Sequence, residues 1–174
     1  MNISVYCSSI TGNTRKLAAY VAEELRGAGH RVELKDSSTP ETGNQTDLPE
    51  SDIIILAFWC RRSGLDDMSA RQLDHWKGRK IIGIGTIGGD AKGDYGDRVR
   101  TNVGKAIERE NICLGVEVCQ GAINLKRVEK RRYLPKENKH FVSPGKYRRF
   151  LKTQGHPDQE DLDRVAAYVK EILS

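Results

Sequence analysis

The segment Ser8-Ser9-Ile10-Thr11-Gly12-Asn13-Thr14 decides how the chain is interpreted, because it separates a short apolar stretch from a long amphipathic one. It carries four hydroxyl side chains, one amide and a glycine, which can adopt a left-handed backbone. It also precedes a predicted helix, whose first backbone N–H groups have no intrahelical partner and whose dipole favours an anion. The segment, here called the 8–14 loop, therefore predicts a cradle for a phosphate monoester. A Walker-type loop is excluded because its Gly-Lys-Ser/Thr sequence is missing here.

Five strand patterns alternate with helix patterns along the chain. Residues 53–58 and 80–85 are almost entirely apolar, which is typical of parallel strands covered on both faces. Strands are also predicted at 3–6, 31–35 and 112–119, helices at 14–27, 68–76, about 97–110 and from 158 onward, and a loop or irregular helix at 36–50. The alternating pattern of the fifth strand indicates a sheet edge. This order predicts an open α/β sandwich with right-handed crossovers, in which ligands bind beyond the carboxyl ends of the strands.

Length and composition predict one domain spanning residues 1–174. We expect a cytoplasmic protein, because the chain begins without a signal-peptide pattern and no apolar stretch approaches membrane-spanning length. The four cysteines show no CxxC pairing and the four histidines are scattered. We therefore expect reduced thiols and no metal site.

The charge of the chain is uneven. Residues 125–152 contain eleven Lys or Arg and two Glu, a net charge of +9, so the rest of the chain carries −4 of the total of +5. We interpret residues 124–156 as a basic insertion before the last helix. It lacks a recognisable nucleic-acid motif, so nucleic-acid binding is not favoured, and a charged surface helix and loop is the commoner explanation. Our preferred hypothesis is a docking surface for an acidic redox partner, because charge steers protein encounters.

A family resemblance rests on the 8–14 loop. Ser9 to Thr14 resembles the flavodoxin pattern Ser/Thr-x-Thr-Gly-x-Thr, at the same place after the first strand. Such a run is most often only a helix N-cap, and its context is what favours the resemblance. The resemblance implies a flavodoxin-like five-stranded parallel sheet in the order 2-1-3-4-5 with helices on both faces. It also implies FMN as cofactor, with its phosphate bound by Ser9, Ile10, Thr11, Gly12, Asn13 and Thr14.

The same resemblance assigns residues to the flavin ring. Trp59, after the third strand, matches a stacking aromatic residue, although it could instead cap the core. Cys60 follows it where many flavodoxins have glycine, and Tyr95 resembles a second stacking residue. The backbone of Thr86, Ile87, Gly88 and Gly89 matches the loop that faces the pyrimidine edge. Arg61 and Arg62 are either solvated loop residues or cations beside the flavin.

Further short motifs, Cys119-Gln120-Gly121 and His156-Pro157-Asp158, resemble a bacterial flavodoxin-like subgroup that includes accessory proteins of the gut bilirubin reductase. The resemblance implies an FMN-binding carrier that delivers electrons to a partner reductase, with no side chain acting as acid, base or nucleophile. An FMN-dependent NAD(P)H:quinone or flavin reductase on the same fold is the alternative. A third possibility is a binding protein that has lost flavin.

Overall fold

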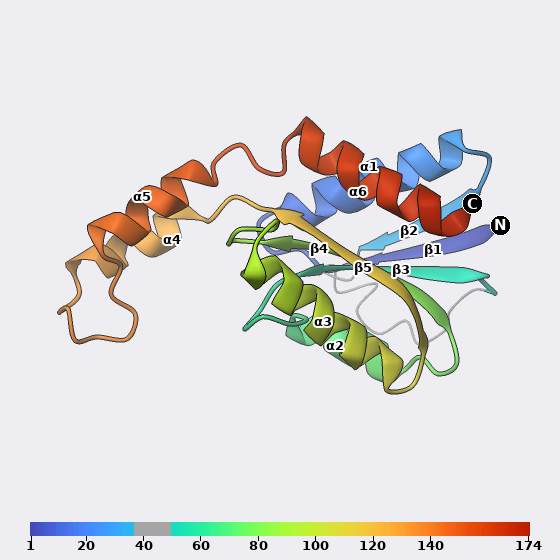
Figure 1. Cartoon of the computed structure of the whole chain (residues 1–174), viewed down its shortest axis with the longest axis horizontal. Helices are drawn as coiled ribbons and strands as arrows, with labels where there is room; N and C mark the ends of the chain where they lie inside the picture. The colour runs from blue at the N-terminus through green and yellow to red at the C-terminus, as the bar shows by residue number, and fades with distance from the viewer. Residues whose placement is uncertain (37–49) are drawn as a thin grey trace.

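A five-stranded parallel sheet forms the centre of the computed structural model, which describes residues 1–36 and 50–174 (Figure 1). The strand order is β2-β1-β3-β4-β5, as the family resemblance implied. The strands are β1 (Asn2–Cys7), β2 (Arg31–Asp36), β3 (Ile53–Trp59), β4 (Lys80–Ile87) and β5 (Ile112–Gln120). The predicted edge position of the fifth strand is confirmed, whereas the loop predicted at 36–50 lies almost wholly outside the described residues.

Two pairs of helices enclose the sheet and give the predicted three layers. Helices α1 (Asn13–Gly27) and α6 (Gln159–Leu173) cover one face, and α2 (Asp67–Asp74) and α3 (Asp94–Glu108) cover the other (Figure 1). Each face packs its own apolar cluster against the sheet. None of the helices in the described residues is long and apolar enough to cross a membrane.

The central strand β3 explains why the sheet forms here. Successive side chains of a strand point to opposite faces, and each of these faces is covered. Ile55 and Ala57 therefore pack beneath α1 and α6, whereas Leu56 and Phe58 pack beneath α2 and α3. Gly85 of β4 makes room for Phe58, because a Cβ atom at that glycine would lie 2.4 Å from the ring. Full burial of such a ring stabilises the fold by roughly 2–3 kcal/mol.

Helix α3 begins three residues before its predicted start. Gly96 is buried in the first turn of the helix. A Cβ atom there would lie 2.2 Å from the Ala91 carbonyl oxygen, so the glycine allows a close contact that the helix needs. Tyr95, predicted in the loop, therefore belongs to the helix.

The basic segment forms a projecting arm, defined here as residues 124–156. It contains α4 (Leu125–Glu129), the 3-10 helix η1 (Lys130–Tyr133) and α5 (Pro144–Lys152). Figure 1 shows these helices extending away from the sheet beyond the carboxyl ends of the strands. Two hydrogen bonds close the base of the arm, from Ile123 N to Thr153 Oγ1 (2.9 Å) and from Ala122 N to His156 O (2.9 Å). The arm thus leaves and rejoins the body beside the expected ligand-binding edge.

Candidate functional site

The 8–14 loop presents an open helix start. Gly12 has a φ of 91° and directly precedes α1, and its N–H donates to Ser9 Oγ over 3.1 Å. In the described residues no side chain caps α1 and its first turn contains no acidic residue. By contrast, α2 and α6 are capped by Asp66 and Asp158. The first N–H groups of α1 and the Ser9 hydroxyl hydrogen are thus donors available to an anion.

The predicted cradle residues divide into two groups. Thr11 is exposed and borders a pocket, and Ile10 is 64 % exposed at the tip of the loop. Thr14 is buried instead, with its Oγ1 atom 2.8 Å from Oγ1 of Thr86. Thr14 therefore connects the start of α1 to β4, and its hydroxyl already has a protein partner.

Asn13 connects the loop to the strand end on the other side. Its Nδ2 atom donates to the carbonyl oxygen of Ala122 over 2.9 Å. A Cβ atom at Gly121 would lie 3.1 Å from Thr86 Cβ and 3.2 Å from Asn13 Nδ2. The absence of a side chain at Gly121 thus lets the segment after β5 approach the loop closely.

Asp66 holds the loops of the site in place, and the sequence analysis missed it. This carboxylate is fully buried and accepts from Ser8 Oγ (2.8 Å), from Trp59 N (3.2 Å) and from donors at the start of α2. It therefore joins the 8–14 loop to the end of β3. Aspartate is a common N-cap, and Asp66 lies two residues before the helix predicted at 68–76, which is the signal that could have found it.

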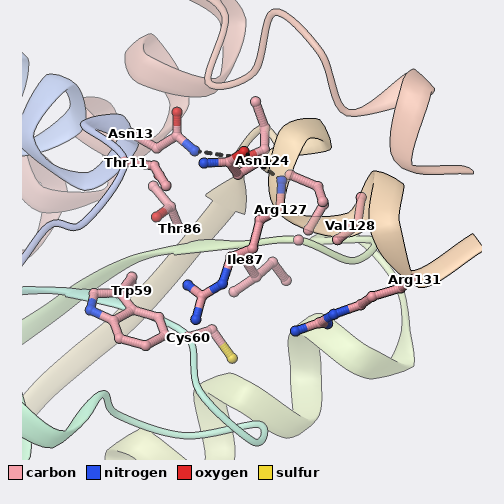
Figure 2. A pocket seen from close by; sticks show the side chains of 14 residues that line it. Thr11, Asn13, Trp59, Cys60, Thr86, Ile87, Asn124, Arg127, Val128 and Arg131 are labelled. Carbon is pink, nitrogen blue, oxygen red and sulfur yellow. Dashed lines mark hydrogen bonds between the residues drawn. The ribbon is translucent and has the colours of Figure 1, made fainter. Parts of the chain in front are cut away.

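A pocket of about 300 Å³ opens beside the 8–14 loop (Figure 2). Trp59 lies at its wall and is half-buried. Residues from four segments line the pocket: Thr11 and Asn13; Trp59 and Cys60; Thr86, Ile87 and Gly88; and residues 121–124 with Arg127, Val128 and Arg131. The structure thus brings together the three loops expected from the sequence and adds a fourth wall from the arm.

Two residues predicted to contact the flavin ring, Gly89 and Tyr95, do not line this pocket. Tyr95 packs behind Gly89, where a Cβ atom would lie 2.6 Å from the tyrosine ring. Its hydroxyl lies 3.5 Å from Cys60 Sγ. Burial, followed by the contact with Cys60, raises the pKa of Tyr95 above its usual value, so the phenol stays protonated at neutral pH. Tyr95 supports the Cys60 loop from behind in this structure.

The cations of the pocket also differ from those considered in the sequence. Arg61 forms an ion pair with Asp67 and starts a tight turn in which Arg62 and Ser63 have φ values of 51° and 61°. Neither Arg61 nor Arg62 borders the pocket, whereas Arg127 and Arg131 of the arm do. Periodicity could not reveal this, because these arginines are distant in sequence from the other lining residues.

A family model described as a flavodoxin domain matches residues 4–170. The chain belongs to the flavodoxin family. It is 28 % identical over 177 residues to the flavodoxin-like domain-containing protein BilS of Clostridioides difficile (strain CD3), covering 99 % of this chain and 97 % of the relative. Membership supports an electron-transfer flavoprotein of the FMN type.

Solved flavodoxins share the fold. Oxidised Flavodoxin 1 from Bacillus cereus aligns with a TM-score of 0.59 at 18 % identity, over 99 % of this chain and 97 % of that one. Oxidised Flavodoxin 2 from the same organism gives a TM-score of 0.53 at 19 % identity, over 69 % and 84 %. The flavodoxin domain described here therefore has the sheet and helix arrangement of these proteins.

The residues of the site fit FMN. Hydroxyl and backbone donors at the 8–14 loop suit a phosphate. The pocket of about 300 Å³, with Trp59 in its wall, suits a planar ring. Backbone bonds fix the walls, since Cys60 N donates to Thr86 O over 3.0 Å and Gly121 N to Ile87 O over 2.8 Å.

A second, basic groove of about 530 Å³ adjoins this pocket at Gly88. Its body side contains Gly89, Asp90 and Gln120, and its arm side contains Lys146, Arg149, Phe150, Lys152 and Thr153. The groove therefore places three cations of α5 beside the loop after β4.

The structure also gathers His156, Asp158 and Asp161 so closely that they could hold a metal ion. Their contacts have another explanation. Asp158 and Asp161 form a capping box at the start of α6, and His156 Nδ1 lies 2.5 Å from Asp161 Oδ2. These bonds connect the arm to the last helix.

Proposed function

We propose that this flavodoxin domain binds FMN and delivers electrons to a partner reductase. The observation that carries the proposal is the uncapped start of α1 opening beside a pocket walled by Trp59. Bound FMN would supply the electron-accepting and electron-donating chemistry. The protein's part is to bind and orient it and to limit its access to water.

Each wall has a distinct task in this proposal. Ser9, Thr11 and the first N–H groups of α1 would bind the phosphate, while Ile10, Gly12 and Asn13 shape the loop. The Trp59 ring would pack against the flavin ring. The backbone of residues 86–89 would face the ring edge, Cys60 would line the pocket beside Trp59, and Thr14 and Tyr95 would support these loops from behind.

The electron carrier is favoured over the NAD(P)H-dependent reductase by the position of α4. A reductase needs space for a nicotinamide against the flavin, but Arg127 and Val128 close the arm side of the pocket. We expect slow bleaching of the bound flavin when NADPH is mixed in by anaerobic stopped flow. Rapid direct bleaching would instead support the reductase.

We further propose that the arm binds an acidic partner protein. Tyr133 is 79 % exposed and Leu151 is 45 % exposed among the cations of the arm, and exposed aromatic and Arg side chains are typical of interfaces. The groove beside Gly88 would bring such a partner close to the flavin.

We regard residues 1–174 as one functional unit. We further propose that it works in a reducing cytoplasm, since Cys60, Cys113 and Cys119 are free thiols.

Titration of flavin-free protein with FMN and with riboflavin tests the cofactor site. We expect Thr11→Val to weaken FMN binding by about tenfold or more, because a hydrogen bond to a charged group is lost. Riboflavin, which lacks the phosphate, should bind the variant and the native protein equally. The control is Thr101→Val on the exposed side of α3. Unchanged FMN affinity in folded Thr11→Val protein would contradict the proposed phosphate site.

A further inference from the structure

The contacts of α4 place its side chains over the proposed flavin pocket. Asn124 caps the helix, accepting from Arg127 N over 3.1 Å, and Val128 is buried. Ile123, just before the helix, packs against Gly88, where a Cβ atom would lie 2.2 Å from Ile123 Cδ1. Together with the Ile123–Thr153 bond described above, these contacts fix the helix at the mouth of the pocket.

Arg127 and Arg131 extend from this part of the arm into the pocket. They are four residues apart, so they lie on the same side of a helical segment. Figure 2 shows both side chains directed toward Trp59 and Cys60, with the Arg127 guanidinium nearer to the tryptophan.

Neither arginine has a carboxylate partner within 4.0 Å in the described part of the chain. Their neighbour Arg132 differs, because it pairs with Glu129 and lies 4.1 Å from the centre of the Tyr147 ring. The pocket therefore faces two positive charges that the described protein residues do not neutralise. Such a site favours a ligand that is negative or becomes negative.

We propose that Arg127 and Arg131 contact the flavin ring and bind its reduced, anionic form more tightly than its oxidised form. The inference rests on the proposed function, since it needs FMN in this pocket. Two electrons and one proton convert the neutral oxidised ring into a ring with one negative charge. A guanidinium beside that ring interacts with the added charge and can also donate hydrogen bonds to its carbonyl groups. The arm thus raises the reduction potential of the cofactor.

Potentiometric titration of the FMN-loaded protein with dithionite, beside a reference dye, tests this effect. In Arg127→Gln and Arg131→Gln we expect the affinity for reduced FMN to fall about tenfold relative to oxidised FMN, because each change removes one positive charge beside the ring. A tenfold change in this ratio lowers the two-electron midpoint potential by about 30 mV. Arg127→Lys should retain part of the native potential. The difference from native protein should shrink at high salt.

Matched controls distinguish a direct contact with the flavin ring from a general effect of the positive charge of the arm. Lys126→Gln and Lys130→Gln remove one charge each from exposed neighbours that do not line the pocket. We expect their potentials to stay near the native value. Equal shifts in all four variants, or no shift in the arginine variants, would overturn the inference.

The same titrations distinguish this inference from the proposed function. If the native protein binds FMN and Thr11→Val weakens binding, while the arginine variants leave the potential unchanged, only the role of the arm is wrong. If the native protein binds no FMN, the proposed function fails as well. All variants are at surface or pocket positions, and circular dichroism checks their folding.

Discussion

At the scale of single residues, Asp66 shows how one buried carboxylate can position a site that it does not enter. It accepts hydrogen bonds from Ser8, from the Trp59 backbone and from both donors of Ser69. The negative charge is therefore surrounded by donors, and this satisfies a group that is otherwise costly to bury. Because the bonds reach two loops, the Trp59 wall and the 8–14 loop are fixed relative to each other.

We expect Asp66→Asn to lower the free energy of unfolding by roughly 2–4 kcal/mol, since the new amide hydrogens would face existing donors. Urea unfolding followed by tryptophan fluorescence measures this loss. The neighbouring Asp67→Asn is the control, because Asp67 is exposed and its ion pair with Arg61 is a surface pair worth less than about 1 kcal/mol. Equal losses in both variants would show that Asp66 has no special structural role.

Thr14 and Thr86 give a second prediction at this scale. Their hydroxyl groups are buried and 2.8 Å apart, so Thr14→Val leaves the Thr86 hydroxyl without this partner. We expect a loss of about 1–2 kcal/mol in the free energy of unfolding, measured in urea. Thr11→Val, at an exposed position, should leave stability nearly unchanged. The opposite ranking would place the structural hydroxyl at Thr11.

At the scale of elements, β5 is held between α3 and α6 by a charged contact at the sheet edge. Glu117 Oε1 accepts from Arg100 (2.7 Å) on α3 and from Arg164 (2.8 Å) on α6. Burial alone would raise the pKa of Glu117, but the bonds from the two arginines outweigh it and the pKa is lowered. The folded state therefore binds this proton less readily than the unfolded state.

The lowered pKa of Glu117 predicts a pH dependence of stability. Its stabilising contribution is fully present above the ordinary carboxyl pKa and is lost as the pH falls through the lowered folded-state pKa. We expect Glu117→Gln to unfold more easily by about 2 kcal/mol at pH 7, and to lose less stability than native protein as the solution is acidified. Urea midpoints between pH 7 and pH 3 measure this. Glu171→Gln, exposed on α6, should follow the native profile.

At the scale of the whole molecule, residues 125–152 carry a net charge of +9 and extend beyond the sheet, whereas the rest of the chain is mildly acidic. Three cations of this arm, Lys146, Arg149 and Lys152, line the groove beside Gly88, next to the proposed flavin pocket. An electron acceptor of negative charge should therefore be attracted to the same edge at which electrons would leave.

Two small acceptors of opposite charge test this electrostatic attraction without a known partner. In anaerobic stopped flow, oxidation of the reduced FMN-loaded protein by ferricyanide should slow as salt is added, because attraction is screened. Oxidation by hexaammineruthenium(III) should not slow. Replacing Lys146, Arg149 and Lys152 by Gln should flatten the ferricyanide profile. Identical salt profiles for both acceptors would contradict a steering role for the arm.

The sequence by itself determined the layered sheet, because the short, almost entirely apolar runs at 53–58 and 80–85 are typical of strands covered on both faces and alternate with helix patterns. It also located the 8–14 loop, whose composition and place before a helix have a local physical cause. Strand order came from the family resemblance, since periodicity carries no information about which strands pair. The structure confirmed that order.

Only the tertiary structure decided which side chains meet at the pocket. Thr14 and Thr86 pair across 72 positions, Tyr95 lies behind Gly89, and Arg127 reaches the wall that contains Trp59. Local pattern determines which way a helix or strand presents its apolar face. Contacts between distant segments depend instead on how the layers pack and on where glycines such as Gly88 and Gly121 allow a close approach, which short-range sequence patterns do not encode.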